Sequence, residues 1–420
     1  MSGCSLPPSK EIEEFFAKAG FRNFALVDPA QAFTESNELW KNRRNAFIRW
    51  IHENKHGAMS YLEQNLEIRT NPIGLLPKTK SALVFLVPYS TGKRVRKNTK
   101  SLLISRTEAP HSAESRTEQT NSKPRPQASS DVKVARYARH KDYHKVIKKN
   151  LNAAIGALQQ KLGIEFNSKI IVDSVPFLDR AHAELAGLGF VGKNTMLIRP
   201  GLGSYFFIAS VLLDLDLTFL SDACGKSPDS QAITKTSLAS VSCKTCTKCV
   251  DACPTQALDG QYKLDATKCF SYWSIESRTV PPNFIKPVFK DLFFGCDICQ
   301  EVCPYNEFTL DERSFSEFLE EAESLHCLKL EQIAVMSTSE YESWFGGLPL
   351  TRAKYSGLIR NALYSLAAQE DPKPLQKALD FWVATRKALV ASGQEGRTYS
   401  LIFESLEDIL QILAKGSDSL

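Results

Sequence analysis

The feature that most constrains this sequence is a set of cysteines at short, fixed spacings within residues 243–303. The first run reads C-x2-C-x2-C-x3-C-P and ends at Cys253. Three thiolates at these spacings wrap the corners of an iron–sulfur cubane, whereas the fourth, held off by three residues and followed by proline, faces a second cluster. The second run, C-x2-C-x3-C-P, begins at Cys296 and lacks one cysteine, which Cys269 can supply.

Exchange of the last cysteine between the two runs gives two sites of four thiolates, which we predict to hold two 4Fe–4S clusters. The predicted ligands are Cys243, Cys246, Cys249 and Cys303 for cluster one, and Cys253, Cys269, Cys296 and Cys299 for cluster two. Structural zinc is the alternative, because C-x2-C pairs also build zinc ribbons, but zinc has no use for the third cysteine or for two C-P endings. The other three of the 11 cysteines, Cys4, Cys224 and Cys327, are interpreted as bystanders.

The length of 420 residues favours two or three domains. Residues 1–21 contain no apolar run of the kind found in signal peptides, and no apolar stretch approaches the roughly 20 residues that a membrane helix needs. We therefore expect a monomeric, cytoplasmic protein without membrane association. In that compartment thiols stay reduced, and clustered cysteines indicate metal rather than disulfides.

Polar and apolar patterning predicts an α+β protein in four parts. They are a mixed α/β core at 1–90 and 132–220, a disordered basic insertion at 91–131, an inserted two-cluster ferredoxin-like module at 221–310, and an α-helical domain at 311–420. The insertion is expected because residues 105–131 contain no Val, Ile, Leu, Met or aromatic side chain. Within the core, the pattern predicts strands at 82–87, 169–174 and 205–215 and helices at 143–162 and 179–188.

Positive charge is concentrated in one part of the chain. The net charge is +5, yet residues 91–149 carry +11 and the rest about −6. A basic strip on an otherwise acidic chain indicates nucleic-acid binding, and the alternative is a solvated linker followed by a lysine-rich helix face. Its ordered half, with Arg136, Arg139 and Lys145, is expected to contact RNA more strongly, because a flexible segment loses freedom on binding. The alternative contacts are basic residues of the C-terminal domain, Arg352, Lys354 and Arg360.

Asp173 lies at the end of a predicted strand, the usual place for functional side chains in α/β domains. Downstream, Gly187, Gly189 and Gly192 form a G-x-G-x-x-G pattern that would let backbone approach a ligand closely. The pattern does not open a helix as a dinucleotide site does. Taken alone, Asp173 is more often a helix cap or a turn residue.

Several motifs in fixed order resemble the epoxyqueuosine reductase family. They are Ala135-Arg-Tyr-Ala with Asp142-Tyr-His144, Asp173-Ser-x-Pro with Asp179-Arg180, Ala186-Gly-Leu-Gly-x-x-Gly-Lys-Asn194, Gly203-Ser204, and the cysteine arrangement with isolated Cys269. Upstream, His56-Gly-x-Met59-x-Tyr61, Arg69 and Leu76-Pro77 also fit. Arg352, Arg360 and Asn361 resemble the start of the family's C-terminal helical repeat. The resemblance covers about residues 46–306 without the insertions.

This resemblance implies a cobalamin-dependent enzyme that reduces epoxyqueuosine to queuosine at the wobble position of tRNA, the last step of queuosine biosynthesis. It implies that an external donor of ferredoxin or flavodoxin type feeds electrons through the clusters to a cobalamin in the α/β core, and that the C-terminal repeat is HEAT-like. Asp173 matches the family's proton donor. The implied cobalamin contacts are Asp173, Leu197, Ile208, Ser271 and Asp297.

Two other interpretations remain open at this point. A reductive dehalogenase also couples cobalamin to two 4Fe–4S clusters, but it is typically exported with a twin-arginine signal and has no reason for a basic strip or a helical repeat. A two-cluster electron-transfer protein would leave the motifs at 173–194 and most of the chain unexplained.

Overall fold

The computed structural model describes residues 5–6, 10–96, 132–217, 241–326, 328–392 and 396–417. Most of the predicted insertion, the loop at 221–240 and the three bystander cysteines lie outside these ranges. One part of the insertion prediction is wrong. Strand β4 (Arg94–Arg96) pairs in parallel with β9 (Phe308–Leu310), so backbone pairing gives order where composition predicted none.

The core is built on one five-stranded sheet with the strand order β1-β2-β3-β8-β5, in which every neighbouring pair is antiparallel. Its strands are β1 (Ser5–Leu6), β2 (Asn23–Val27), β3 (Ser81–Pro88), β8 (Phe206–Leu213) and β5 (Ser168–Ile171). Strand β3 pairs along its whole length with β8, from Ser81 opposite Leu213 to Pro88 opposite Phe206. These two strands form the centre of the domain.

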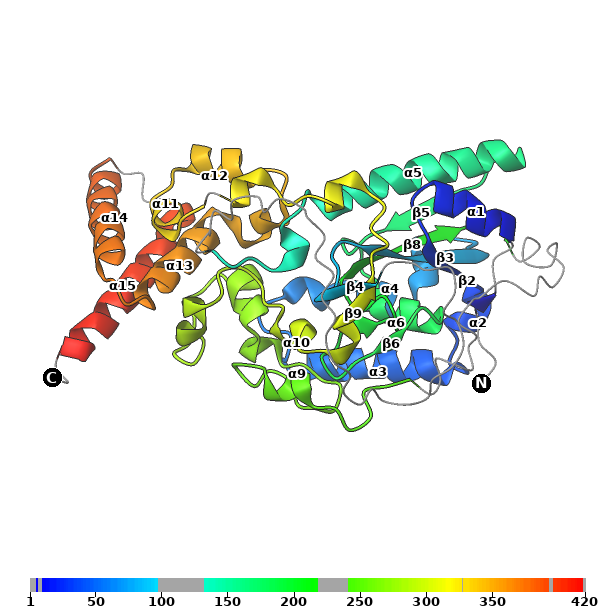
Figure 1. Ribbon diagram of the computed structural model, residues 1–420, viewed down its shortest axis with the longest axis horizontal. Helices are drawn as coiled ribbons and strands as arrows, with labels where there is room; N and C mark the ends of the chain where they lie inside the picture. Colours follow the sequence, from blue (N-terminus) through cyan, green and yellow to red (C-terminus); the bar gives the residue numbers. More distant parts are fainter. Residues whose placement is uncertain are drawn as a thin grey trace, which may run out of the picture.

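Helices cover both faces of this sheet (Figure 1), which explains why all eight residues of β3 are buried. Side chains alternate between the faces of a strand. Leu83, Phe85 and Val87 therefore pack with α1 (Lys10–Lys18) and α5 (Tyr143–Leu162), whereas Ala82, Val84 and Leu86 pack with α6 (Asp179–Leu185). The predicted strand at 82–87 is confirmed.

The predicted helix at 143–162 is also confirmed as α5, with Asp142 at its N-cap and Gly163 in the left-handed conformation at its C-cap. Two other elements are shorter than predicted. Strand β5 stops at Ile171 because the chain turns at Asp173, where φ is +51°. Helix α6 stops at Leu185 because Gly187, with φ +70°, reverses the chain.

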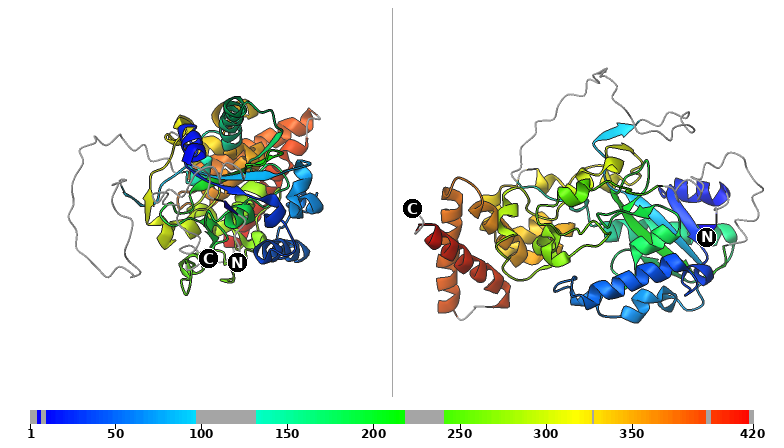
Figure 2. Two further views of the ribbon diagram at one scale, coloured as in Figure 1. Left: turned by 90° about the vertical axis from the view of Figure 1, so that its right-hand side faces the viewer. Right: turned by 90° about the horizontal axis from the view of Figure 1, so that it is seen from below.

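The cysteine-bearing module lies between the sheet and the C-terminal helices in the two views in which the long axis is horizontal (Figure 1 and the right-hand view of Figure 2). It consists of short helices and turns. They are α9 (Lys248–Asp251), η4 (Ala266–Lys268), η5 (Tyr272–Glu276), η6 (Lys286–Lys290), α10 (Ile298–Glu301) and η7 (Pro304–Asn306). Phe270, Phe289 and Phe293 belong to the same apolar core as the C-terminal helices, so the two regions pack as one body.

The described part of the chain after β9 is helical. After the 3-10 turns η8 (Ser316–Phe318) and η9 (Glu323–Leu325), it contains α11 (Leu330–Ala334), α12 (Thr338–Phe345), η10 (Pro349–Ala353), α13 (Lys354–Ala367), α14 (Lys373–Ala391) and α15 (Arg397–Ser417). Helix α13 is central and packs against α11, α14 and α15. In the described ranges, none of the helices combines the length and the apolar character needed to cross a membrane.

Candidate functional site

The eight cysteines of the two runs form two neighbourhoods. The pKa of Cys303 is raised to about 11, first by burial and then by the thiolates of the first run. The pKa of Cys296 is raised to about 12, again by burial first, with further contributions from Cys269 and Cys253. Each neighbourhood thus contains cysteines from both runs, as the predicted exchange requires.

Such thiols keep their protons at neutral pH unless a metal takes the place of the proton, so these donor sets fit metal-bound thiolates. Backbone N–H groups point at the sulfurs: Lys193 donates to Cys243 Sγ at 3.4 Å and Ala257 to Cys253 Sγ at 3.3 Å. Hydrogen bonds of this kind tune iron–sulfur clusters. Within the described ranges, no three His, Cys, Asp or Glu side chains close around one point as the ligands of a single ion do. Cubane ligands enclose a body of several atoms and stand further apart.

The glycine-rich motif joins the core to the cysteine module. Lys193 Nζ donates to the carbonyl oxygens of Lys244 and Cys246 at 2.9 and 3.0 Å, and Asn194 Nδ2 donates to that of Cys299 at 3.3 Å. At Gly189 the absence of a side chain allows close packing within the protein itself. A Cβ at Gly189 would lie 2.4 Å from the carbonyl oxygen of Ile198, so the close approach is to the neighbouring strand β7 (Leu197–Ile198).

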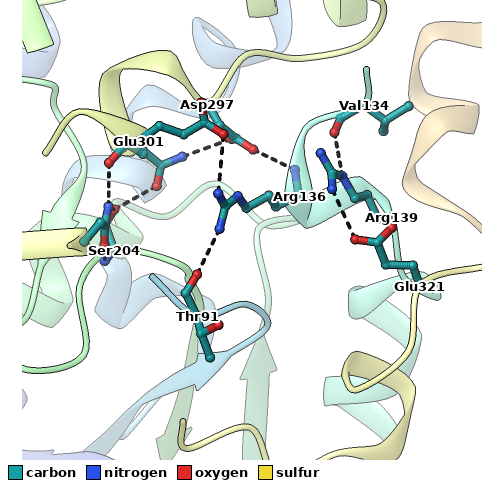
Figure 3. A network of polar contacts seen from close by, with 10 residues as sticks. Thr91, Val134, Arg136, Arg139, Ser204, Asp297, Glu301 and Glu321 are labelled. Atoms are coloured by element: carbon teal, nitrogen blue, oxygen red, sulfur yellow. Dashed lines mark hydrogen bonds and ion pairs between the residues drawn. The ribbon is translucent and has the colours of Figure 1, made fainter. Parts of the chain in front are cut away.

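A second junction, drawn in Figure 3, centres on Asp297 and Arg136. The Arg136 backbone N–H donates to Asp297 Oδ2 at 2.7 Å, and the guanidinium donates to the Thr91 carbonyl at 2.9 Å. That guanidinium also lies 4.6 Å from the centre of the Tyr205 ring and 3.4 Å from Glu301. Ser204 Oγ donates to Gln300 Oε1 at 2.8 Å and completes the link between core and module.

These contacts make Arg136 and Arg139 less available for RNA than the sequence predicted. Arg139 donates to the Val134 carbonyl at 2.7 Å and to Glu321 at 3.1 Å (Figure 3). Both guanidinium groups bind groups of the protein itself and stabilise the fold, while their side chains remain 23% and 33% exposed. Their contact with RNA stays a prediction. Lys145 is exposed on α5 and remains available.

Arg360 is not available for RNA, because its side chain is fully buried in α13. Its guanidinium donates to the carbonyl oxygens of Trp273, Ser277 and Thr279 at 2.5, 2.8 and 3.1 Å. Asn361 Nδ2 donates to those of Ser274 and Phe293 at 2.8 and 3.0 Å. These carbonyls lie between Cys269 and Cys296, so α13 holds two of the three segments that carry ligands of the predicted cluster two.

We expect Arg360→Ala to destabilise the module by about 3 kcal/mol or more, since several buried carbonyls lose their donor at once. Thermal melting of the anaerobic holoprotein and the rate of iron release to a chelator measure this effect. Lys377→Ala, on the exposed face of α14, is the control and is expected to change neither. Equal melting temperatures for both variants would contradict the structural role of Arg360.

Asp173 follows β5 at a sharp turn, in the left-handed backbone conformation that non-glycine residues adopt mainly where structure enforces it. Its side chain is 67% exposed. Tyr143 Oη donates to Asp173 Oδ2 at 2.6 Å, and His144 Nε2 lies 3.9 Å from the same oxygen. His144 Nδ1 is 2.9 Å from Asp142 Oδ1. The arrangement is an exposed carboxylate oriented by a tyrosine and faced by an imidazole, which is able to hold and move protons.

A second carboxyl, Asp179, lies within the electrostatic range of Asp173. Burial raises its pKa to about 8, and the charge of Asp173 adds to this effect. The Oδ1 atom of Asp179 is buried with no hydrogen-bond partner in the described structure. Asp179 therefore stays protonated near neutral pH, whereas Asp173 faces solvent. Two carboxyls in such different surroundings are typical of acid–base sites.

Two comparisons concern parts of the chain. Residues 242–306 match the 4Fe–4S double cluster binding domain, and residues 69–174 match the family described as epoxyqueuosine reductase QueG, DUF1730. A third spans most of it: an epoxyqueuosine reductase of Leadbetterella byssophila is 34% identical over 360 residues, which are 85% of this chain and 97% of the relative. This chain belongs to the epoxyqueuosine reductase family.

Other epoxyqueuosine reductases agree with this assignment. The one from Pseudomonas aeruginosa is 31% identical and covers 88% of either chain. The solved epoxyqueuosine reductase from Streptococcus thermophilus has a TM-score of 0.68 at 21% identity, over 97% of this chain and 98% of its own. A crystal structure of epoxyqueuosine reductase with a tRNA-Tyr epoxyqueuosine-modified stem loop has a TM-score of 0.63 at 23% identity, over 96% and 98%. At these identities the structures establish the fold. The dehalogenase and the plain electron carrier are therefore set aside.

The other residues that resemblance to epoxyqueuosine reductases implied as cobalamin contacts lie in different surroundings. Leu197 is 2% exposed and packs in the core, so its side chain has almost no surface left for a ligand. Ile208 and Ser271 are half-buried. Asp297 is buried, and burial raises its pKa, while its contact with Arg136 acts in the opposite direction. Their role as contacts stays a prediction.

Tyr143 and Asp179 had no predicted role, although both stand within motifs that resemble epoxyqueuosine reductases. Tyr143 looked like the start of an amphipathic helix, and its ring does stack on Phe207 at 4.1 Å. Only its hydroxyl reaches Asp173. Its position one residue after the N-cap Asp142, in Asp-Tyr-His, was the available signal.

Proposed function

We propose that this protein reduces epoxyqueuosine to queuosine in tRNA in the cytoplasm, as a monomer, using two 4Fe–4S clusters and a bound cobalamin. The protein is an oxidoreductase of the epoxyqueuosine reductase family, with a double-cluster domain for electron transfer. The observation that carries the proposed mechanism is the exposed Asp173 carboxylate, held by Tyr143 at a strained turn.

The cluster ligands in this proposal are those of the predicted exchange: Cys243, Cys246, Cys249 and Cys303 for cluster one, and Cys253, Cys269, Cys296 and Cys299 for cluster two. Support comes from the mutual pKa effects of thiols from different runs. Zinc stays less suitable because both neighbourhoods use cysteines from both C-P runs.

The space between Asp173 and Asp297 is the proposed place for cobalamin. The Tyr205 hydroxyl is buried without a partner in the described structure, and its pKa is raised by burial and affected by Arg136 and Asp297. An orphaned hydroxyl here suits a group that enters the site and offers a hydrogen-bond acceptor. Residues proposed to hold it are Asp173, Ile208, Ser271, Asp297 and the backbone at Leu197. When bound, cobalamin would supply a cobalt able to pass electrons to the epoxide.

The remaining chemistry belongs to side chains of this chain. Reduction of an epoxide to an alkene consumes two electrons and two protons, breaks both C–O bonds and releases the oxygen as water. Asp173 donates a proton to the departing oxygen, and the Tyr143 hydroxyl keeps the carboxyl oriented at 2.6 Å. His144, fixed by Asp142, passes a proton from solvent to Asp173, which then donates the second proton that the oxygen needs to leave as water. Because the protein leaves Asp173 exposed, the substrate and cofactor must supply any desolvation of its carboxyl.

The proposed path for the anticodon passes Tyr61 and Arg352. Tyr61 is 42% exposed, and the Arg352 guanidinium lies 5.2 Å from its ring centre. Partial burial raises the pKa of Tyr61, and the charge of Asp173 adds to this effect. Arg352 also binds Glu276 at 2.9 Å. An exposed aromatic ring beside a guanidinium suits an unstacked base and its phosphate. Among the alternative RNA contacts, exposed Lys354 therefore remains together with Arg352, in the proposed HEAT-like region.

Anaerobic purification followed by iron, sulfide and cobalt assays and by turnover on epoxyqueuosine-containing tRNA tests this function. We expect about eight irons per chain, cobalt bound after loading, and conversion to queuosine detected by mass spectrometry of nucleosides. Queuosine-containing tRNA is the control substrate and is expected to stay unchanged. Iron at full content with no conversion under any reductant would count against the proposed reaction.

A further inference from the structure

The loop that carries the first three ligands of the proposed cluster one lies at the surface. Cys243 and Cys246 are half-buried, whereas Cys249 and Cys303 are buried. Between them, Lys244 and Lys248 are exposed. The four predicted ligands of cluster two are also half-buried, whereas the loop of cluster one carries two exposed lysines between its cysteines.

Positive charge gathers on this loop. Lys193 Nζ is fixed against the Lys244 and Cys246 carbonyls, which places its ammonium group on the same loop as the side chains of Lys244 and Lys248. In the described residues neither of these two lysines forms an ion pair with a carboxylate. The acidic side chain next to them, Asp251, accepts a hydrogen bond from Thr247 at 2.7 Å.

Two tyrosines lie close to the same thiols. Tyr262 is 39% exposed, and burial followed by the charge of Cys243 raises its pKa. Tyr305 Oη donates to the Ser242 carbonyl, next to Cys243, at 3.3 Å, and its ring packs on Phe190 at 5.4 Å. Aromatic side chains are enriched at protein-binding surfaces, and the surrounding lysines add charge that attracts an acidic partner.

Cluster two is linked to the proposed reaction site. Asp297, which directly follows its predicted ligand Cys296, accepts a hydrogen bond from the Arg136 N–H at 2.7 Å, and the Arg136 guanidinium lies 4.6 Å from the centre of the Tyr205 ring. The anticodon path proposed above, at Tyr61 and Arg352, is formed by other segments. The proposed electron path therefore enters at cluster one and leaves from cluster two.

We propose that Lys193, Lys244, Lys248, Tyr262 and Tyr305 form an electron-entry surface that docks a one-electron carrier protein with an acidic face. This inference rests on the proposed function and adds the place and the charge of the partner. Complementary charge brings the carrier to the cluster quickly and in one orientation. Each docked carrier gives up one electron and is oxidised, so two carriers supply the two electrons that one epoxide consumes.

RNA is the competing occupant, because phosphates are also acidic. The observations favour a protein, since the basic groups surround the thiols of cluster one and not the Asp173 site. A carrier must come close to the cluster for electron transfer, whereas the modified base must reach Asp173.

The double variant K244E/K248E tests the electron-entry surface, with reduced flavodoxin as the acidic probe and dithionite as the small reductant. We expect the reduction of the clusters by flavodoxin to slow at least tenfold at low salt. This rate is measured without tRNA, as the loss of visible absorption. Reduction by dithionite should stay within twofold of the unaltered protein. K80E/K169E carries the same charge change on exposed lysines of the sheet and should behave like the unaltered protein with both reductants.

The outcomes separate the possibilities. Equal slowing with flavodoxin and dithionite would mean that the variant damages the cluster, and unchanged rates with flavodoxin would mean that no docking occurs there. A loss of tRNA affinity in place of a loss of flavodoxin rate would assign the surface to RNA. Because cluster reduction is measured without substrate, its result stands even if turnover on epoxyqueuosine tRNA fails.

Discussion

Replacement of Asp173 by Ala is expected to slow turnover on epoxyqueuosine tRNA by ~10²–10⁴-fold, the usual effect of losing a general acid. The clusters should survive, because the side chain is exposed and its side-chain contacts are with the Tyr143 hydroxyl and the His144 ring. Iron content and the visible spectrum of the clusters measure this, together with single-turnover rates. Asp173→Asn keeps a hydrogen-bond acceptor for Tyr143 and should be equally slow, since an amide is not an acid.

Asp179→Asn is the matched comparison. Its carboxyl is protonated near neutral pH because burial raises its pKa to about 8, so a neutral amide replaces a neutral acid. We expect turnover within about tenfold of the unaltered enzyme. If Asp179→Asn is inactive and Asp173→Asn turns over normally with intact cofactors, the proton comes from the buried carboxyl. Normal turnover in both variants would transfer the role to His144 or water.

Replacement of Cys269 by Ala is expected to remove one cluster and leave the other. Iron should fall from about eight to about four atoms per chain, because one corner of cluster two loses its thiolate. Turnover should be lost, since electrons no longer pass beyond cluster one. Iron and sulfide analysis, with electron paramagnetic resonance of the reduced protein, counts the clusters that remain.

Cys327→Ala is the control, because this cysteine lies outside the spacing pattern. It should retain all iron and full activity. Full iron in Cys269→Ala would refute the ligand assignment and require another fourth ligand. Loss of both clusters would mean that the Cys269 thiolate also stabilises the rest of the module. The backbone hydrogen bond from the Trp273 N–H to the Cys269 carbonyl, at 3.3 Å, does not involve the side chain.

Local patterns predicted the main elements of the core well. The continuous apolar run of β3 and the amphipathic period and caps of α5 depend on neighbouring residues, which a sequence displays directly. Element ends were less predictable. Strand β5 ends early because of the turn at Asp173, and that conformation is imposed by contacts with α5 that are distant in sequence.

The basic strip shows the limit of reading charge from sequence. Three arginines carry positive charge that could bind phosphates: Arg136, Arg139 and Arg360. Each of their guanidinium groups donates hydrogen bonds to carbonyl or carboxylate oxygens of the protein. A guanidinium offers the same donors to either partner. Which partner it meets depends on whether folding buries it, and local sequence does not record that.

By itself, the sequence determined the cluster chemistry and the family, because cysteine spacing and ordered motifs are local properties that survive without a fold. Only the tertiary structure decided which of these motifs contact one another. The glycine-rich segment joins core and module through Lys193 and Asn194. Tyr143 and His144 contact Asp173, which lies about 30 residues further along the chain. Such contacts arise when helices pack on a sheet and bring side chains from distant elements within hydrogen-bond reach, a consequence of packing that no local spacing encodes.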